Sequence, residues 1–169
     1  MRSLTELLID FRRSREAMEQ LVKNTPRIIG VEAVRVVKQN FLIEGYDSGT
    51  GVTKWPPRAD ATNKAYMAGR GKGKQGRYKG SVFSASKPLL RQTLNLYNSI
   101  QYRAYGTRVF IGTNLSLVPY AQAHNQGLNH QPVRQYMPWP NQPPNKKILL
   151  AIGKKVNLER DKALRIFKR

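Results

Sequence analysis

Acidic residues are missing from a long central part of this chain. All ten Asp and Glu residues lie within residues 1–60 or at Glu159 and Asp161, so the 98 residues 61–158 contain none, whereas they contain 15 Lys or Arg. A segment of this kind cannot neutralise its charge through internal ion pairs, so its surface carries one sign. The commonest physical use of such a surface is binding to a polyanion with release of counterions. We therefore expect a nucleic acid or an acidic protein surface as its neighbour.

The same distribution of charge argues against enzymatic chemistry. Acid–base catalysis and Mg²⁺ binding usually need paired carboxylates, which here would come from the N-terminal segment or from Glu159 and Asp161. The chain has no Cys, and its two histidines, His124 and His130, have no acidic residue near them in the sequence. Zinc sites and charge-relay triads depend on such partners. We therefore predict a protein that is not an enzyme and that has no metal ion or other cofactor.

Size and hydropathy are those of a small folded protein. The 169 residues, of which 40% are apolar, suffice for one domain or for one domain with an arm. No apolar run approaches the roughly 20 residues that a membrane helix needs. An amphipathic pattern rather than a signal peptide follows Met1. We expect a soluble protein that is made in the cytoplasm and has no contact with a membrane.

Two amphipathic helices are predicted at the start of the chain. Ser3 and Glu6 have the spacing of a capping box, and apolar residues then recur at helical intervals over 4–23. Thr25-Pro26 resembles an N-cap followed by proline at the first helical position, so a second helix is predicted from there to about residue 43. It is apolar on more than one side, which is typical of a central core helix or of a contact between protomers. Its many β-branched residues leave a strand as the minor alternative.

Periodicity fades over residues 44–87, where glycine, proline and lysine dominate, and we predict a long connection with little regular structure. Within it, residues 69–80 read GRGKGKQGRYKG, but the spacing of a phosphate-binding P-loop is missing. One interpretation is a solvated loop. The other is an electrostatic contact with a phosphate backbone. The second interpretation depends on five basic residues, namely Arg70, Lys72, Lys74, Arg77 and Lys79.

A third helix and a β-hairpin are predicted next. Pro88 can open a helix that ends near Ser99. Apolar residues alternate with polar ones on either side of Tyr105-Gly106-Thr107, which predicts a hairpin over residues 100–112. The sheet predicted from this pattern is small and antiparallel.

The last third of the chain is expected to contain two further helices. The segment 119–127 suits a short helix that Gly127 stops. The proline-rich residues 129–144 are expected to be extended, with an edge strand at 133–137. A helical pattern returns over 146–169, with Gly153 as a weak point within it.

Large aromatic residues stand in the irregular segments. Trp55 precedes Pro56-Pro57, and Trp139 lies between two prolines. A tryptophan in a loop usually anchors that loop to the core through its large apolar area, and this is our main interpretation. An exposed stacking surface for bases is the alternative. The tyrosines are spread too evenly for a ribonucleoprotein-type motif, so recognition of single strands is not predicted.

The order of these pieces resembles that of the virion morphogenesis, or tail-completion, proteins of tailed bacteriophages, including the Mu-like members. The resemblance covers about residues 25–140. It begins with an apolar helix, which is followed by a Trp-Pro-Pro loop and a basic linker. A helix that ends in Ser and a strand that ends in Gly come next. The segment 120–127, YAQAHNQG, is similar to the family's tyrosine–alanine, histidine and glycine signature, and 132–136, PVRQY, to its proline, arginine and aromatic segment. The matching positions include Trp55, Ser99, Gly112, Tyr120, His124, Gly127 and Arg134.

Two features depart from the family pattern. Leu94 stands where the family often has glycine, and the helix from residue 146 onward carries no distinctive motif. By the resemblance, residues 25–145 form the tail-completion-like α+β domain, in which 44–87 is the long basic loop. Residues 1–24 are then an N-terminal helical arm, and 146–169 are a C-terminal basic helix.

The resemblance implies a structural protein of the virion at the head-to-tail junction. Its α+β fold would pack helices on a small antiparallel β-sheet, with the basic loop and the C-terminal helix added. It would assemble as a homo-oligomer in a closed cyclic ring, with a hexamer among the expected sizes, around the channel for packaged double-stranded DNA. It would join the tail to the head and contact other neck, connector or tail proteins.

The charge of the chain agrees with that placement, because a cationic ring can contact phosphates without reading bases. We expect the five basic residues of 69–80 to contact DNA or an acidic neighbour together with Arg103, Arg108, Lys154 and Lys155. We expect Tyr120, His124 and Arg134 to hold the loops that present these contacts. His124 in particular is assigned a structural hydrogen bond or an interface contact.

Two other functions compete with this one. A cellular nucleic-acid-binding protein, associated with the ribosome or the nucleoid, would explain the formal net charge of +20 equally well. Salt-sensitive binding to DNA or RNA as a monomer would favour it. A nuclease is third, because the carboxylates that would hold its metal ions are scarce.

Overall fold

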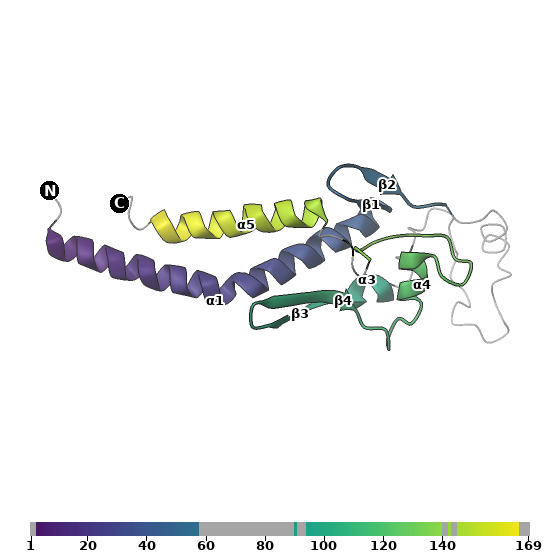
Figure 1. The fold of residues 1–169 in the computed structure, drawn as a ribbon, viewed down its shortest axis with the longest axis horizontal. Helices are drawn as coiled ribbons and strands as arrows, with labels where there is room; N and C mark the ends of the chain where they lie inside the picture. The colour runs from purple at the N-terminus through teal and green to yellow at the C-terminus, as the bar shows by residue number, and fades with distance from the viewer. Residues whose placement is uncertain (1–2, 58–89, 91–93, 140–141, 143–144, 166–169) are drawn as a thin grey trace.

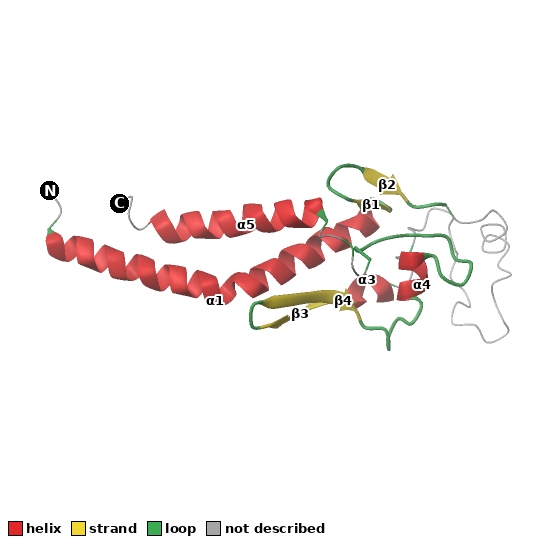
Figure 2. Cartoon of the chain, viewed as in Figure 1, coloured by secondary structure: helices red, strands yellow, loops and turns green. Residues whose placement is uncertain are grey.

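The computed structural model describes residues 3–57, 90, 94–139, 142 and 145–165. The predicted α+β fold is confirmed: helices pack with small antiparallel β-hairpins, and a helix lies near the C-terminus (Figure 2). The basic stretch 69–80 lies outside the described residues. The elements, in chain order, are α1 (Leu4–Leu42), β1 (Gly45–Asp47), β2 (Val52–Lys54), α3 (Asn95–Ser99), β3 (Ile100–Tyr105), β4 (Arg108–Thr113), α4 (Ala121–Gln126) and α5 (Lys146–Leu164).

Helix α1 is continuous, so the prediction of two separate helices at 4–23 and from Thr25-Pro26 onward is wrong. Its start is as predicted, because the Ser3 side chain accepts from the Glu6 N–H and the Glu6 carboxylate accepts from the Ser3 N–H. Pro26 lies inside the helix. A proline there removes one backbone hydrogen bond and its ring crowds the preceding turn, which bends a helix without necessarily ending it. Figure 1 shows this bend about half-way along α1.

The C-terminal half of α1 lies between two neighbours. Helix α5 runs antiparallel to α1 on one side, and hairpin β3–β4 packs on the other (Figure 1). Gly30 is buried beneath the hairpin, where the Tyr102 ring is so close that a Cβ atom added at residue 30 would overlap it. The missing side chain at residue 30 therefore allows the hairpin to approach the helix.

The two hairpins differ in how well the sequence predicted them. Hairpin β3–β4 confirms the prediction over 100–112, with Tyr105 paired to Arg108 across the turn Gly106-Thr107. Gly106 has φ +56°, as the first turn residue of a type II′ hairpin requires. Hairpin β1–β2 lies within residues 44–87, for which little regular structure was predicted. Its strands have only three residues each, too few for periodicity to show.

Three further segments can be compared with the predictions. Helix α3 ends at Ser99 as predicted and begins at Asn95, directly after Leu94, whose φ of +57° lies outside helical geometry; residues 88, 89 and 91–93 of the predicted helix lie outside the described residues. Helix α4 is confirmed and stops at Gly127, whose φ is +73°. The strand predicted at 133–137 is absent, and its backbone is instead hydrogen-bonded to α4 and to a side chain. Helix α5 is confirmed and runs through Gly153 without a break.

The core is concentrated at the C-terminal end of α1. The Phe41 ring meets the rings of Trp55, Tyr97 and Tyr136 at centroid distances of 5.4, 5.8 and 5.1 Å. Burial raises the pKa of the Tyr136 hydroxyl to about 12, and this hydroxyl donates to the Ala121 carbonyl. The remaining buried apolar residues around this centre are Ala33, Val36, Val37, Leu96, Ile100, Val118, Ala121 and Ile148. The region of α1 before its bend contributes no apolar residue to this core.

Candidate polyanion interface

Hairpin β3–β4 has an inner and an outer face. Side chains alternate along each strand, and the register pairs Arg103 with Phe110 and Tyr105 with Arg108. Ile100, Tyr102 and Ile111 face the packed side. The side chains of Arg103, Tyr105, Arg108 and Phe110 are exposed on the other side. The outer face thus carries both of the arginines that the sequence analysis selected in this hairpin.

Two diagonals cross on the outer face. Diagonal neighbours on one face of an antiparallel pair are close enough for long side chains to meet. The aromatic diagonal joins Tyr105 to Phe110, with ring centroids 6.0 Å apart and an interplanar angle of 68°. The other diagonal joins Arg103 to Arg108. Tyr105 and Phe110 are 61% and 57% exposed, so the aromatic pair packs mainly on itself, and the register places Arg103 and Arg108 at the other two corners of the same face.

A hollow lies beside this crossing. Gly112 pairs with Gln101, and no atom lies within 4 Å of where a Cβ at residue 112 would be. The resulting depression has a volume of about 360 Å³, and its lining includes Gln101, Arg103, Phe110 and Asn114. An arginine and two amide side chains therefore border a space that an anionic group can enter, while the aromatic ring forms its apolar edge.

The chemistry of this surface suits a phosphate polymer. Arginine forms paired hydrogen bonds to phosphate oxygens, and it needs no base edge to do so. No acidic residue occurs in the hairpin or anywhere in residues 61–158, so no carboxylate of this stretch competes for the two guanidinium groups. The outer face, defined here as Arg103, Tyr105, Arg108, Phe110 and the hollow at Gly112, is our candidate polyanion interface.

The basic residues on α5 lie elsewhere. Lys154 is exposed, but Lys155 reaches toward α1 and pairs with Glu159 at 3.0 Å. Lys162 pairs with the same carboxylate oxygen at 3.0 Å, and hydrogen bonds from the two lysines lower the pKa of Glu159. Helix α5 and the hairpin lie on different sides of α1 (Figure 1). The structure therefore places Arg103 and Arg108 on one face of the hairpin and keeps Lys154 and Lys155 apart from them, while Arg70, Lys72, Lys74, Arg77 and Lys79 lie outside the described residues.

Arg134 joins three segments near the core. Its side chain is buried and donates from Nε to the Pro56 carbonyl and from Nη2 to the Pro57 carbonyl, both at 3.2 Å. Its backbone N–H donates to the His124 carbonyl at 2.8 Å. Trp55 fixes the same loop from the other side, because its Nε1 donates to the Gln135 carbonyl at 2.6 Å. The tryptophan is 7% exposed, which agrees with the anchoring interpretation rather than with a stacking surface.

His124 lies beside this junction. Its ring meets the Tyr120 ring edge to face at 5.9 Å, and its Nδ1 atom is buried without a hydrogen-bond partner. The structural hydrogen bond expected for His124 is therefore not made by its Nδ1 atom. Burial, and to a smaller extent the nearby charge of Arg134, lower the pKa of His124. The lowered pKa favours the neutral imidazole at neutral pH.

Gly127 and Ser99 complete the positions that the resemblance selected. A Cβ at Gly127 would crowd the Val133 side chain, and the positive φ there closes α4. Ser99 is buried and donates to the Leu96 carbonyl at 2.8 Å, which closes α3. Ser99 ends α3 directly before the hairpin, and Gly127 ends α4 before the segment that contains Arg134.

Three buried asparagines were missed by the sequence analysis. Asn40 donates to the Tyr136 carbonyl and accepts from the Asp47 N–H. Asn125 accepts from the N–H groups of residues 136 and 137, which lie in the segment predicted as an edge strand. Asn145 caps α5 and donates to the Asp47 carbonyl at 2.7 Å. A lone asparagine has no periodicity in sequence, so no pattern of residues indicated these three positions.

Among the described residues, no three of His, Cys, Asp and Glu gather in the way that a metal ion would require. None of the helices in the described part of the chain is long and apolar enough to cross a membrane. Comparisons with protein-family models, with curated proteins and with solved structures found no match.

Proposed function

We propose that this chain is a structural protein of a tailed-bacteriophage virion, located at the head-to-tail junction. In this role it forms a ring around the DNA channel and joins the tail to the head, without catalysing a reaction. The resemblance of residues 25–140 to tail-completion proteins supports the location. The candidate polyanion interface supports the contact with packaged double-stranded DNA or with an acidic neighbouring ring.

The observation that carries the proposal is the outer face of hairpin β3–β4. Arg103 and Arg108 flank an exposed aromatic pair in a stretch of sequence without acidic residues. A surface of this kind binds phosphates through charge and through hydrogen bonds, and its β-ribbon carries no recognised pattern for reading bases. Non-specific contact with DNA is what a channel protein needs, because the packaged DNA passes through it in every sequence.

The experiment measures the salt dependence of binding to double-stranded DNA of random sequence. In the double variant Arg103→Gln/Arg108→Gln, two phosphate contacts are lost, so the slope of log K against log salt falls by about 2 in magnitude. The control is Arg13→Gln/Lys23→Gln, which removes the same charge from exposed positions on α1. It should leave the slope nearly unchanged. Equal slopes for both double variants would remove the hairpin face from the proposal.

A second measurement separates the virion role from that of a cellular nucleic-acid-binding protein. Particles produced with the Arg103→Gln/Arg108→Gln variant should show reduced joining of heads to tails or reduced retention of DNA in electron micrographs. The cellular alternative predicts instead that the purified chain binds DNA or RNA as a monomer and that the chain is absent from virions. Quantitative immunodetection in purified virions decides between the two.

A further inference from the structure

The N-terminal third of α1 carries an apolar stripe that the described residues do not cover. Leu4, Leu7, Leu8 and Phe11 recur at intervals of three and four, so they share one face of the helix. Their exposed fractions lie between 48% and 75%. We call these four residues the N-terminal stripe. Figure 1 shows that α1 extends beyond the end of α5, so that none of the described helices lies beside this part of α1.

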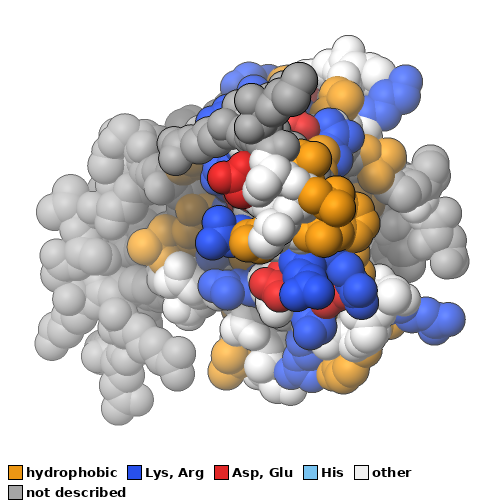
Figure 3. Space-filling model, turned by 90° about the vertical axis from the view of Figure 1, so that its left-hand side faces the viewer, with side chains coloured by type: hydrophobic (Ala, Val, Ile, Leu, Met, Phe, Trp, Pro, Cys, Tyr) orange, Lys and Arg blue, Asp and Glu red, His pale blue; other side chains and the backbone are white. Residues whose placement is uncertain are grey.

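The stripe lies near the N-terminus, at the end of the molecule where both termini lie (Figure 1). Figure 3 views the molecule from the side where both termini lie, and apolar side chains gather there with Lys and Arg beside them. Four exposed side chains of this size present on the order of 400 Å² of apolar surface, which is as large as the largest patch on a typical monomeric protein. A contiguous patch of this size usually marks a contact with a partner.

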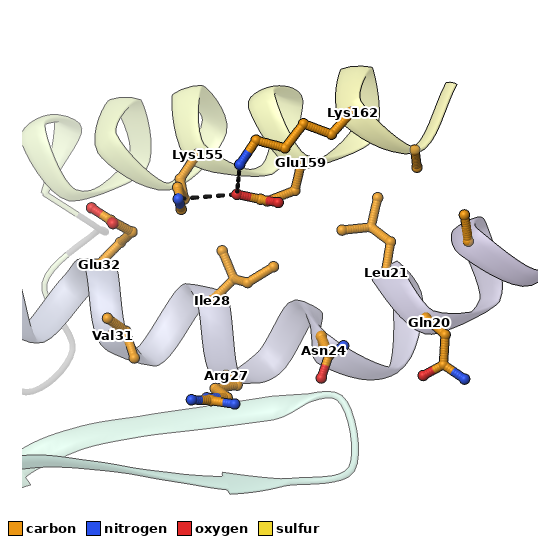
Figure 4. A pocket seen from close by; sticks show the side chains of 12 residues that line it. Gln20, Leu21, Asn24, Arg27, Ile28, Val31, Glu32, Lys155, Glu159 and Lys162 are labelled. Carbon is orange, nitrogen blue, oxygen red and sulfur yellow. Dashed lines mark hydrogen bonds and ion pairs between the residues drawn. The ribbon is translucent and has the colours of Figure 1, made fainter. Parts of the chain in front are cut away.

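A groove between α1 and α5 is the second feature. Its volume is about 670 Å³, and Ala17, Leu21 and Ile28 of α1 line it together with Ala163 of α5. Figure 4 shows Leu21 and Ile28 pointing toward α5 across the open space. The groove lies where Pro26 bends α1, and α5 spans that bend without following it (Figure 1). The bend therefore accounts for the space between the two helices.

The charges on the α5 wall of the groove are already paired. Glu159 accepts from Lys155 and from Lys162, and Figure 4 shows all three side chains above the apolar floor. Each of these three charges thus has an opposite charge at 3.0 Å, while the trio as a whole keeps a net charge of +1. Burial of an unpaired charge is the main cost of covering this wall with an apolar guest.

We propose that the N-terminal stripe of one copy of this chain binds in the α1–α5 groove of the next copy. The volumes agree, because a cavity of about 150 Å³ holds one benzene-sized group, and four groups of about that size fill a groove of 670 Å³. The stripe cannot reach the groove of its own chain, because both lie on the same continuous helix. The contact is therefore between copies.

This contact has a consequence for the symmetry of the assembly. The stripe and the groove are different surfaces, so each copy offers one of each, and the contact is heterologous. Heterologous contacts close into rings when the rotation between copies allows it. The proposal thus deepens the proposed function by naming the interface that builds the ring. It does not depend on which partner the ring meets in the virion.

The test uses the purified full-length chain and measures its mass by sedimentation velocity over a range of concentrations. The stripe variant Leu7→Glu/Phe11→Glu places carboxylates on the apolar face, and the groove variant Ala163→Trp fills the groove. Each variant alone should be monomeric, whereas the unchanged chain forms larger species. The control Leu150→Glu/Leu158→Glu alters equally exposed positions on α5 and should assemble as the unchanged chain does. Circular dichroism checks that each variant retains its helices.

Mixing the two variants gives the sharpest result. The stripe variant retains an intact groove, and the groove variant retains an intact stripe, so an equimolar mixture should form one-to-one dimers that grow no further. If two stripes pair with each other instead, the groove variant will dimerise alone and the mixture will give no heterodimer, which overturns the proposal. An unchanged chain that stays monomeric at every concentration overturns it as well. Because no virion is involved, failure here is distinguishable from failure of the head-to-tail role.

Discussion

Two glycines within helices should respond in opposite ways to the same substitution. Gly30 lies in α1 under the Tyr102 ring, and Gly153 lies in α5 with no atom within 4 Å of a Cβ added there. In an open helix interior, replacement of glycine by alanine stabilises the fold by about 0.8–1.0 kcal/mol. Gly153→Ala should therefore raise the free energy of unfolding by about 1 kcal/mol.

Gly30→Ala gains the same helix propensity, but the new Cβ atom overlaps the Tyr102 ring. Three atoms of the Tyr102 side chain lie closer than 3.0 Å to the position of the new Cβ atom, and the helix backbone cannot move without disturbing α5. Forcing an extra carbon into a packed contact costs about 1–3 kcal/mol, and an overlap with three ring atoms belongs at the upper end. The net effect is a loss of about 1–2 kcal/mol, or a fall in Tm of roughly 2–8 °C for a protein of this size.

The assay is thermal unfolding followed by circular dichroism, with urea unfolding for the free energies. The variant Tyr102→Ala provides the matched background, because Gly30→Ala should become neutral or stabilising once the ring is gone. A coupling energy of about 1–3 kcal/mol between residues 30 and 102 is expected. If Gly30→Ala stabilises the protein as much as Gly153→Ala does, the close packing of the hairpin on α1 is refuted, and with it the orientation of Arg103 and Arg108.

Three further predictions concern the cap of α5, one histidine and the basic loop. Asn145→Ala removes the cap of α5 and leaves the Asp47 carbonyl without its donor. The free energy of unfolding measured in urea should therefore fall by about 2–4 kcal/mol. Asn145→Asp keeps the capping oxygen, so its free energy of unfolding should fall by less. Because the pKa of His124 is lowered in the folded state, the unfolded chain binds more protons below pH 6.5, and stability should fall as the pH falls from 6.5 toward the folded pKa. His124→Gln should flatten Tm against pH in this range, and an unchanged slope would assign the effect to another group. The last variant replaces all basic residues of 69–80 by glutamine, namely Arg70, Lys72, Lys74, Arg77 and Lys79. It should leave the Tm unchanged and impair virion assembly or DNA retention. Full infectivity of this variant would exclude the segment 69–80 from the mechanism.

Local signals predicted the elements that are stabilised locally. Hairpin β3–β4 follows from strict alternation around a glycine turn, and α4 follows from a glycine that can adopt a positive φ. The capping box at Ser3 is equally local. In each case, the residues that determine the element lie within a few positions of one another, so the sequence alone contains the information.

The sequence analysis was wrong where tertiary contacts override a local signal. Proline after threonine is a common start for a helix, but α1 continues through Pro26 with a bend, and packing against α5 on one side can stabilise such a helix. Leu94, within the helix predicted from residue 88, has a positive φ that is rare for leucine, and α3 begins only after it. Nothing in the spacing of apolar residues indicates a backbone angle of this kind.

The candidate interface could be predicted only in part. The charge distribution selected Arg103 and Arg108, but their position on one face depends on the register of the hairpin, and their separation from Lys154 and Lys155 depends on how α1 divides the molecule. The exposed aromatic pair and the hollow at Gly112 were not predicted, because the same residues in a buried strand would have belonged to the core. Side-chain bridges by asparagine likewise depend on loops that are distant in sequence.

The head-to-tail role is tested most directly by electron microscopy of lysates from phage in which the gene for this chain carries an early stop codon. The proposed function predicts separate tails and separate heads in place of complete particles, with joining restored when the chain is supplied from a plasmid. Complete particles with DNA-filled heads and attached tails in the absence of the chain would contradict it.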